Sequence, residues 1–259
     1  MKHLACSLLF LCIVSIGTAA DGILGIWKFD VPSAVRVEDS SGNGYHASLT
    51  GAKWVLGSFG TALLFDKPGT GLDLPKDAGK FDTGSFTLSF WICPFEYDTA
   101  SKYRMKRIMG VSEYPKRWWN VDMNNDGIIE MEMGLTPAGA AAPVNGGSSS
   151  SAKVPLKAWT CIVITVDRDA GKTRFYCNGE LDAERPIPAA FTGPLSMQLP
   201  VHAGYNGENA FLGLFDELMI AARAVTADEV RAAFERKRTG RQSIGYTAAA
   251  IKRVVIVEE

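Results

Sequence analysis

The chain has 259 residues, of which 47% are apolar and 21% charged, and it carries 27 basic against 28 acidic side chains. That length is enough for one large all-β domain or two small ones, and the composition is that of a globular protein with a proper core. The near balance of charge gives no basic excess of the kind that predicts a nucleic-acid partner.

The first twenty residues differ from the rest of the chain. Lys2 precedes an apolar run over residues 4–16, and small residues follow at 18–20. This pattern predicts a secretory signal peptide over residues 1–20, cleaved after Ala20, and hence a secreted or extracytoplasmic protein. The run is too short for a transmembrane helix, so a retained anchor is the weaker alternative, and no later stretch is apolar enough for membrane insertion.

Alternating apolar residues predict strands in most of the chain after residue 20. In FTLSFWI (residues 86–92) the apolar side chains at even positions share one face, and Pro94 ends the run. Further along, CIVITVD (161–167) and TRFYCNG (173–179) flank a turn at RDAG. Two such runs around a short turn predict a β-hairpin.

The cysteines are expected to be free thiols. Matching the apolar faces of the second hairpin pairs Ile162 with Cys177, which places Cys161 on the opposite face from Cys177. Removal of the signal peptide would leave these two and Cys93, an odd number that cannot form a closed disulfide framework. A single disulfide, which an oxidising compartment would permit, is the alternative.

The segment DMNNDGIIEMEM (residues 122–133) begins like the calcium loop of an EF-hand, with acidic or amide residues at alternate positions before a glycine. An EF-hand needs a helix on each side and a glutamate at the twelfth position, where Met133 stands. The flanking residues alternate like strands instead. They predict a hairpin with a three-residue turn at 125–127, in a register that pairs Met123 with Ile129.

The other face of this predicted hairpin is polar. Like charges directly opposite each other are unfavourable, so a cation from the basic run KYRMKR just upstream, or a bound ligand or ion, is expected to neutralise it. A tryptophan among polar groups on a sheet face is typical of a platform on which sugar rings stack. The candidate carbohydrate-binding residues are therefore Trp118, Asn120 opposite Glu132, and Asp122 opposite Glu130.

Residues 136–151, TPAGAAAPVNGGSSSS, form a low-complexity segment. Because such a sequence has little apolar surface to bury, it predicts a mobile loop inside the domain. A loop at this position offers a second interpretation of Trp118, as a side chain that the loop partly covers.

One helix is predicted near the C-terminus. Thr226 and Glu229 match a capping box at its start, and Gly240 is expected to end it. Val230 and Phe234, together with Ala233, form its apolar stripe.

Seven segments in order resemble those of laminin-G-like jelly-roll domains of the concanavalin A-like lectin/glucanase superfamily. The segments are GIWKFD (25–30), EDSSGNGYHASLTG (38–51), GSFGTALLFD (57–66), GSFTLSFWICP (84–94), AWTCIVITVD (158–167), FYCNGEL (175–181) and FLGLFDELMIAARAVTADEV (211–230). The resemblance covers about residues 21–240. It implies an all-β fold, a two-sheet antiparallel jelly-roll β-sandwich with one short C-terminal helix. Residues 241–259 would be a tail with a candidate edge strand.

A calcium site is the main metal hypothesis. In the loop DSSGNG, oxygen-bearing side chains alternate at Asp39, Ser41 and Asn43, and oxygen ligands suit a hard cation such as calcium. The resemblance implies that this loop meets Asp216 at a structural Ca²⁺, and Asp30, at the end of the first predicted strand, could add an oxygen. The alternative is an Asx-type turn without metal.

Three classes of function remain open. A non-catalytic binding module for a polysaccharide or glycan is favoured, because no catalytic constellation assembles. Laminarinase-type hydrolases carry their acids as E-x-D-x-x-E on one strand, and the stretch with Glu130 and Glu132 has neither the central aspartate nor the third acid. Asp216–Glu217 is a second candidate acid pair. His202 lies in HAGYNGENA, which faintly resembles a motif of jelly-roll alginate lyases, but an ordinary strand is preferred. A polysaccharide hydrolase or lyase is thus the second hypothesis, and a structural or adhesive protein that binds a cell-surface protein is the third.

Overall fold

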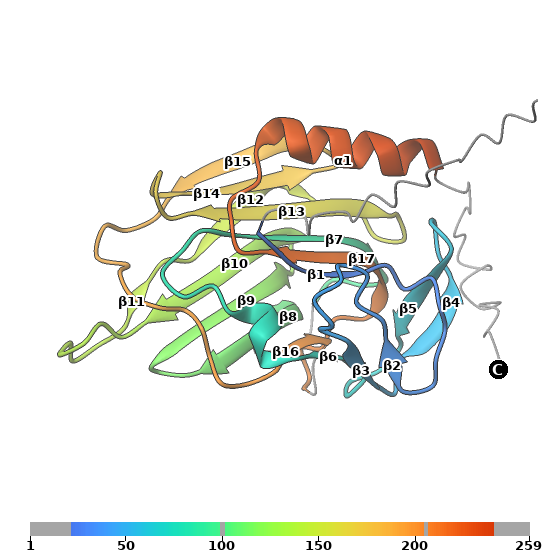
Figure 1. Cartoon of the computed structure of the whole chain (residues 1–259), viewed down its shortest axis with the longest axis horizontal. Helices are drawn as coiled ribbons and strands as arrows, with labels where there is room; N and C mark the ends of the chain where they lie inside the picture. The colour runs from blue at the N-terminus through green and yellow to red at the C-terminus, as the bar shows by residue number, and fades with distance from the viewer. Residues whose placement is uncertain (1–21, 99–101, 205–206, 241–259) are drawn as a thin grey trace, which may run out of the picture.

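The computed structural model describes residues 22–98, 102–204 and 207–240. Two antiparallel β-sheets, which we call sheet A and sheet B, pack face to face, and helix α1 lies on the outer side of sheet A (Figure 1). The fold is thus the two-sheet antiparallel sandwich with one C-terminal helix that the sequence resemblance implies. Within the described parts of the chain, no helix is long and apolar enough to cross a membrane.

Sheet A runs in the order β15-β14-β13-β7-β17-β5-β4, and β1 pairs with β17 beside β5. Its central strands come from distant parts of the chain, so it assembles only when the whole domain folds. Its strands are β1 (Ile23–Trp27), β4 (Lys53–Leu56), β5 (Thr61–Phe65), β7 (Phe86–Pro94), β13 (Thr160–Asp167), β14 (Lys172–Cys177), β15 (Glu180–Pro186) and β17 (Gly213–Ala221).

Sheet B runs in the order β11-β10-β9-β8-β16-β6-β3-β2, and β12 also pairs with β10. A short 3₁₀ helix, η1 (Lys76–Gly79), follows β6. The strands of sheet B are β2 (Arg36–Val37), β3 (Ala47–Thr50), β6 (Gly71–Leu74), β8 (Met105–Glu113), β9 (Arg117–Asn124), β10 (Ile128–Leu135), β11 (Val144–Asn145), β12 (Ser148–Lys153) and β16 (Val201–Gly204).

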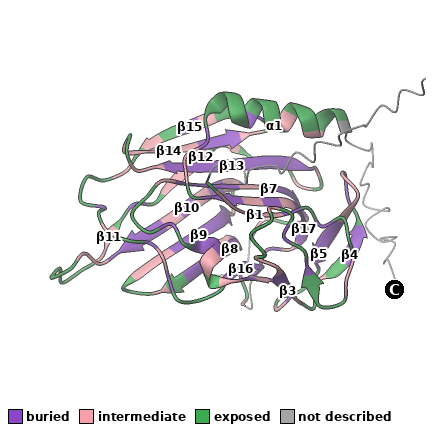
Figure 2. Cartoon of the chain, in the orientation of Figure 1, coloured by how far each residue is buried: buried purple, intermediate pink, exposed green. Residues whose placement is uncertain are grey.

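The core lies between the sheets. Buried residues are found on strands of both sheets (Figure 2). On β7, Phe86, Leu88, Phe90 and Ile92 are all fully buried there, as their alternation predicts. Sheet B contributes the opposite wall, in which Trp119 is also fully buried. The strand β7 ends at Pro94, in agreement with the sequence.

The two hairpin predictions are confirmed. Strands β9 and β10 are joined through residues 125–127, Gly127 has a φ of 84°, and Met123 lies opposite Ile129. The EF-hand interpretation is therefore excluded by strands on both sides of the turn. In the second hairpin, Ile162 pairs with Cys177.

The cysteine prediction is also confirmed. Cys93 and Cys161 are buried free thiols, and Cys177 is a partly buried one. Burial raises the pKa of Cys161 to about 12, so this thiol is protonated and unreactive at neutral pH.

Helix α1 (Ala227–Gly240) begins with the predicted capping box. The Thr226 amide donates to Glu229 Oε2 over 2.8 Å, and the Glu229 amide donates to Thr226 Oγ1 over 3.2 Å. Val230 and Phe234 turn towards sheet A, where they join a second apolar cluster outside the main core. Ala233, the third residue of the predicted stripe, is exposed.

The prediction of a loop over residues 136–151 is wrong in its second half. Val144–Asn145 and Ser148–Lys153 form β11 and β12, which both pair with β10. The reason is that β10 would otherwise present unpaired backbone groups at the sheet edge, and a polar segment can satisfy them without apolar side chains. Asp182 accepts hydrogen bonds from two β12 amides, over 2.6 Å from Ser151 and 2.9 Å from Ala152.

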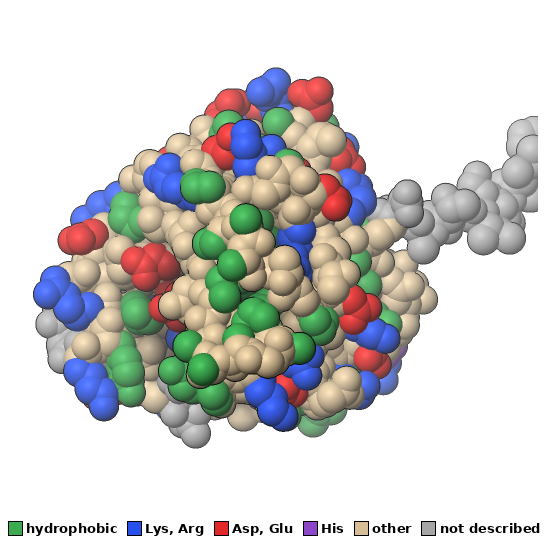
Figure 3. All heavy atoms as spheres, turned by 90° about the vertical axis from the view of Figure 1, so that its left-hand side faces the viewer, with side chains coloured by type: hydrophobic (Ala, Val, Ile, Leu, Met, Phe, Trp, Pro, Cys, Tyr) green, Lys and Arg blue, Asp and Glu red, His purple; other side chains and the backbone are tan. Residues whose placement is uncertain are grey.

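Both predicted ends of the chain, the signal peptide 1–20 and the tail 241–259, lie outside the described residues. At the end of the molecule that faces the viewer in Figure 3, acidic and basic side chains are interspersed around the rim. That face has no single-sign patch, which agrees with the balanced composition.

Candidate functional site

The outer face of sheet B is hollowed into a groove, which we call the sheet B groove. Two adjoining hollows of ≈ 240 and ≈ 190 Å³ share His202 and Gly204. The first extends over β6 and β3 to Asp73 and Thr50, and the second over β8 and β9 to Asn120. The groove therefore crosses the strands rather than following one of them.

A single row of residues, directly opposite one another, spans the groove. It consists of Asp73 on β6, His202 on β16, Gly110 on β8, Asn120 on β9 and Glu132 on β10. Since neighbouring strands lie about 4.8 Å apart, this row is about 19 Å long from end to end. Every member is polar or glycine, so the outer face of sheet B offers hydrogen-bonding groups across five strands.

Glycines form the floor of the groove because no side chain fits there. A Cβ atom at Gly204, whose φ is 84°, would lie 2.3 Å from the Thr70 carbonyl oxygen, and one at Gly71 would lie 2.4 Å from that of Ala203. At Gly110, a Cβ atom would lie 2.4 Å from Asn120 Oδ1, so the Asn120 amide extends over this glycine. The two hollows are therefore lined by glycine at Gly71, Gly204 and Gly110, and of these Gly110 lies beneath the Asn120 amide.

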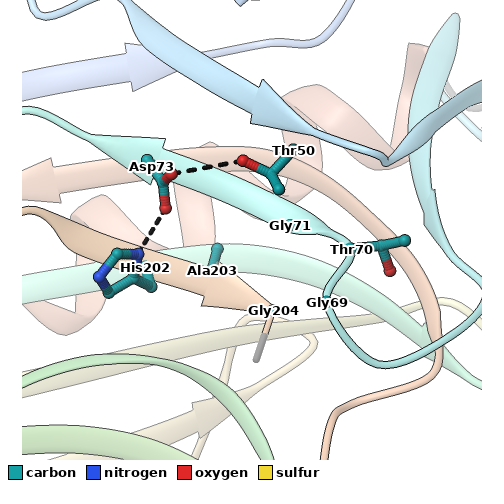
Figure 4. Close-up of a pocket in the computed structure, with 8 residues that line it drawn as sticks. All are labelled: Thr50, Gly69, Thr70, Gly71, Asp73, His202, Ala203 and Gly204. Atoms are coloured by element: carbon teal, nitrogen blue, oxygen red, sulfur yellow. Dashed lines mark hydrogen bonds and ion pairs between the residues drawn. The ribbon is translucent and has the colours of Figure 1, made fainter. Parts of the chain in front are cut away.

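At one end of the groove, Asp73 Oδ1 and His202 Nδ1 are within hydrogen-bond distance of each other (Figure 4). Thr50 Oγ1 lies 3.4 Å from the other carboxylate oxygen of Asp73. The sequence interpretation treated His202 as part of an ordinary strand and did not single out Asp73. Each of the two residues stands between buried apolar neighbours on its strand. This alternation of apolar and polar residues in the sequence could have predicted that both side chains point outward.

The predicted acidic face is neutralised by Arg107, one of the basic residues proposed for that role. Its Nε donates to Asp122 Oδ1 over 2.5 Å, and its guanidinium lies 3.8 Å from Glu132. The neighbouring amides contribute too, since Asn124 donates to Glu130 over 2.9 Å and Asn120 lies 3.5 Å from Glu132. The five predicted carbohydrate-binding residues thus lie on one face, with Arg107 among them.

Asp122 has an unusual protonation equilibrium. Burial raises its pKa to about 7, and the favourable charge of Arg107 offsets only part of this effect. The side chain is fully buried, and its Oδ2 has no hydrogen-bond partner within the described structure. Asp122 therefore supports the groove from below rather than facing a ligand directly.

Trp118 lies flat against the sheet. A Cβ atom at Gly134, its direct partner on β10, would fall 2.1 Å from Trp118 Cζ2, so the indole covers this glycine. The ring of Tyr114, whose residue is 72% exposed, lies 5.1 Å from that of Trp118 at a tilt of 54°. The two aromatic side chains form a partly open platform at the turn end of β9.

Two of the predicted calcium ligands stabilise a loop. Asp39 accepts four hydrogen bonds, from the amides of Ile26, Ser41 and Tyr45 and from the Ser41 hydroxyl. Although burial opposes it, these hydrogen bonds lower the pKa of Asp39. Asn43 Nδ2 donates to the carbonyl oxygens of residues 23 and 24, each over 2.9 Å. The geometry of this loop is that of the Asx-type turn.

The other two, Asp30 and Asp216, are brought together elsewhere. Asp216 is fully buried; burial raises its pKa well above the usual range, and the charges of Glu217 and Asp30 add to the effect. Its Oδ1 accepts from the Glu217 amide over 2.8 Å, whereas Oδ2 has no partner in the described structure. An unpartnered buried carboxylate oxygen fits a metal ligand. Among the described residues, however, no three or more His, Cys, Asp or Glu side chains converge to hold a metal ion.

The candidate acid pairs are engaged in ion pairs or hydrogen bonds. Glu217 accepts from Lys237 Nζ over 2.5 Å on the side of sheet A that faces α1. Glu130 and Glu132 are bonded to Asn124 and Arg107, as described above. None of these carboxylates is paired with another across an open site.

Solved structures share the fold at low sequence identity. The binding domain of Paraclostridial Mosquitocidal Protein 1 is 18% identical with a TM-score of 0.66, over 83% of this chain and 52% of that one. The botulinum neurotoxin serotype D ligand binding domain, in complex with N-acetylneuraminic acid, is 17% identical with a TM-score of 0.63, over 83% and 51%. This chain therefore spans about half the length of these toxin domains.

A third structure matches along almost its whole length. Domain 4 of AbnA, a GH43 extracellular arabinanase from Geobacillus stearothermophilus, in complex with arabinotriose, is 21% identical with a TM-score of 0.61, over 81% of this chain and 97% of that one. At such identities these likenesses concern the fold. No curated protein sequence matches the chain. The family model for the concanavalin A-like lectin/glucanases superfamily, Laminin_G_3, matches residues 66–231, and the chain belongs to this family.

Proposed function

We propose that this protein is a secreted, non-catalytic carbohydrate-binding module that binds a polysaccharide or glycan in the sheet B groove. The observation that carries the proposal is the straight polar row from Asp73 to Glu132, which crosses five strands over a glycine floor. An extended chain of sugar rings presents hydroxyl groups along its length, and such a row offers a donor or acceptor at nearly every strand.

Each part of the groove suits one part of a sugar. Carboxylate and amide side chains such as Asp73 and Asn120 can each pair with neighbouring hydroxyl groups, because they offer two polar atoms side by side. The apolar face of a sugar ring can stack on Trp118 and Tyr114, since aromatic rings combine a large apolar area with low conformational cost. The glycine floor allows the ring to approach the backbone.

The structural neighbours support this choice of ligand. One was solved with arabinotriose and another with N-acetylneuraminic acid, so domains of this fold accept sugars of different kinds. Secretion rests on the predicted signal peptide over residues 1–20, which is consistent with a ligand outside the cell.

A glycan array followed by calorimetry on its best ligand tests the proposal. His202→Ala should weaken binding by about ten-fold, because it removes one hydrogen-bonding group and the partner of Asp73. His46→Ala is the matched control, since His46 is also a partly exposed histidine paired with a carboxylate, Glu38, at 2.7 Å. Failure to bind any glycan, or equal effects of the two substitutions, would contradict the assignment.

As a second part of the proposal, we infer a structural Ca²⁺ beside Asp30 and Asp216, completed by backbone carbonyl oxygens and water. The unpartnered Oδ2 of Asp216 supports it. Calcium should then raise the thermal midpoint of the wild type by several degrees and that of Asp216→Asn by much less. Asp126→Asn, in the exposed β9–β10 turn, serves as the control. An unchanged wild-type midpoint with calcium or chelator would remove the metal from the proposal.

A polysaccharide hydrolase or lyase is the second candidate, and one observation favours it. The hydrogen-bonded Asp73–His202 pair lies in an open groove, and a carboxylate that orients a neutral imidazole is a common general-base arrangement. Release of reducing ends or of unsaturated products from the bound polysaccharide, abolished in His202→Ala, would replace the binding-module assignment with this one.

A further inference from the structure

A second cavity lies on the opposite side of the molecule, between α1 and the outer face of sheet A. We call it the α1 cleft. Its volume is ≈ 550 Å³, and an adjoining hollow of ≈ 260 Å³ shares six residues with it, namely Ser89, Val163, Met219, Val230, Ala233 and Arg236. Cavities of this size hold small organic ligands in other proteins. None of the residues proposed for the sheet B groove lines the α1 cleft.

The walls of the α1 cleft are apolar and aromatic. Trp91 on β7 stacks on Phe234 of α1, with ring centroids 5.7 Å apart at 14°, and Phe59 meets the same indole edge-on at 4.7 Å. The Phe234 ring also packs on Gly179, where a Cβ atom would lie 2.8 Å from it. This contact holds the helix above β14 and β15 and leaves Met219 and its neighbours on β17 uncovered.

The rim of the cleft is cationic. Four basic side chains line the two hollows, against two acidic ones, Glu217 and Glu229. Both acids are already compensated: Lys237 lies 2.5 Å from Glu217, and Arg223 lies 2.6 Å from Glu229. The basic residues are Lys28, Arg223, Arg236 and Lys237, which gives the lining a net charge of +2.

Lys28 and Arg236 are therefore the cations available to a ligand. Lys28 is exposed and lies close enough to Glu217 to lower the pKa of that carboxyl, which burial otherwise raises. The Arg236 guanidinium is exposed and has no ion-pair partner in the described part of the chain. An apolar cavity with two such cations at its mouth complements a molecule with an apolar body and one anionic group.

We propose that the α1 cleft is a second binding site, for a small soluble amphipathic anion such as a medium-chain carboxylate. The alkyl chain lies against Trp91, Met219 and Val163, and the carboxylate faces Lys28 and Arg236. A sugar would not suit this site, because most of its hydroxyl groups would lose water without gaining a partner. A cation would be repelled by the rim.

Calorimetry with decanoate on the full chain, together with displacement of the dye 1-anilinonaphthalene-8-sulfonate, tests the proposal. Arg236→Gln and Lys28→Gln should each weaken decanoate binding about three- to five-fold, as expected for a partly exposed charge contact. Arg238→Gln is the matched control, because Arg238 is on the same helix but pairs with Glu235 at 2.7 Å and does not line the cleft. Decanol should bind more weakly than decanoate.

A steric variant tests whether decanoate binds in the α1 cleft or elsewhere on the protein surface. Ala233→Phe places a ring at an exposed helix position that lines both hollows, so it should abolish decanoate binding while leaving the thermal midpoint nearly unchanged. Absence of decanoate binding in the full chain would overturn the proposal, and it is the result expected if residues 241–259 or a second copy of the chain fill the cleft. Equal binding of decanol, or equal effects of the two arginine substitutions, would overturn it as well.

Discussion

The two outer faces of the sandwich follow the same alternation of side chains but carry opposite chemistry. On sheet B most outward positions are polar or glycine, as in the row that includes Asp73, His202 and Asn120. On sheet A the outward positions include a cluster of apolar side chains, among them Trp91 and Val163, and both of these are buried. A polar sheet face can remain open to water, whereas an apolar one must be covered.

Helix α1 covers the outer face of sheet A only in part. The difference in polarity between the two outer faces therefore determines both candidate sites. The sheet B groove is open because its groups are satisfied by water or sugar hydroxyls alike. The α1 cleft exists because a helix of 14 residues cannot span a sheet of eight strands. One sandwich can thus present two sites whose ligands have unlike polarity.

The largest expected effect concerns the floor of the sheet B groove. Gly204→Ala should destabilise the fold by about 3 kcal/mol or more, because it combines a positive φ with a Cβ atom 2.3 Å from the Thr70 carbonyl. Gly139→Ala is matched in φ, at 78°, but its Cβ would meet nothing within 4 Å, so it should cost only about 1 kcal/mol. Urea denaturation measures both, and equal losses would show that close backbone approach does not define the floor.

A second substitution tests the cover of sheet A. Phe234→Ala removes the ring stacked on Trp91 and should cost about 2 kcal/mol, with red-shifted tryptophan emission as Trp91 becomes hydrated. Leu181→Ala, at a residue 54% exposed on β15, should cost about 0.5 kcal/mol or less. A Phe234→Ala loss as small as the control would mean that α1 contributes little to the stability of this face.

The buried carboxyl beneath the groove should make stability depend on pH. The pKa of Asp122 is about 7 in the folded protein against an ordinary value of 3.8, so the folded state retains a proton that the unfolded state releases between these values. Stability should therefore fall as pH rises from about 4 to 7, by at most about 1.4 kcal/mol per pH unit from this group. Urea midpoints at pH 4.5 and 7.5 should differ less in Asp122→Asn than in the wild type. Asp126→Asn should keep the wild-type difference, and the same slope in all three would contradict the assignment to Asp122.

The smallest expected effect concerns the Tyr114–Trp118 platform, which adjoins the second hollow at Ser112, the partner of Trp118 on β8. Tyr114→Ala should weaken glycan binding about three- to ten-fold by removing one ring of the platform. Tyr103→Ala is the control, since Tyr103 is also largely exposed, at 48%, but precedes β8, whereas Tyr114 follows β8 at the other end of that strand. Calorimetry with the glycan found on the array distinguishes the two variants. If Tyr114→Ala keeps the wild-type affinity, the aromatic platform does not contribute to the binding site, which is then limited to the polar row.

Contacts between segments that are close together in the sequence could be predicted. The β9–β10 hairpin, its turn and its polar face follow from alternation and from one glycine, because strand side chains repeat every two residues and a register slip would expose the core. The role of Arg107 as the neutralising cation was also anticipated, although the basic run alone did not tell which residue would act. The serine-rich β12 was missed, since its pairing depends on the exposed edge of β10 and not on its own pattern.

The all-β class, the local hairpins, the capped helix and the free thiols could be read from the residues alone, because each depends on periodicity or on hydrogen bonds between near neighbours. Apart from the two hairpins, which strands lie side by side became known only from the folded chain. Folding brings Asp73 next to His202 across 129 positions of the chain, and it brings Asp30 close to Asp216. Strand order depends on how two whole sheets bury their apolar faces together, and no local pattern contains that information.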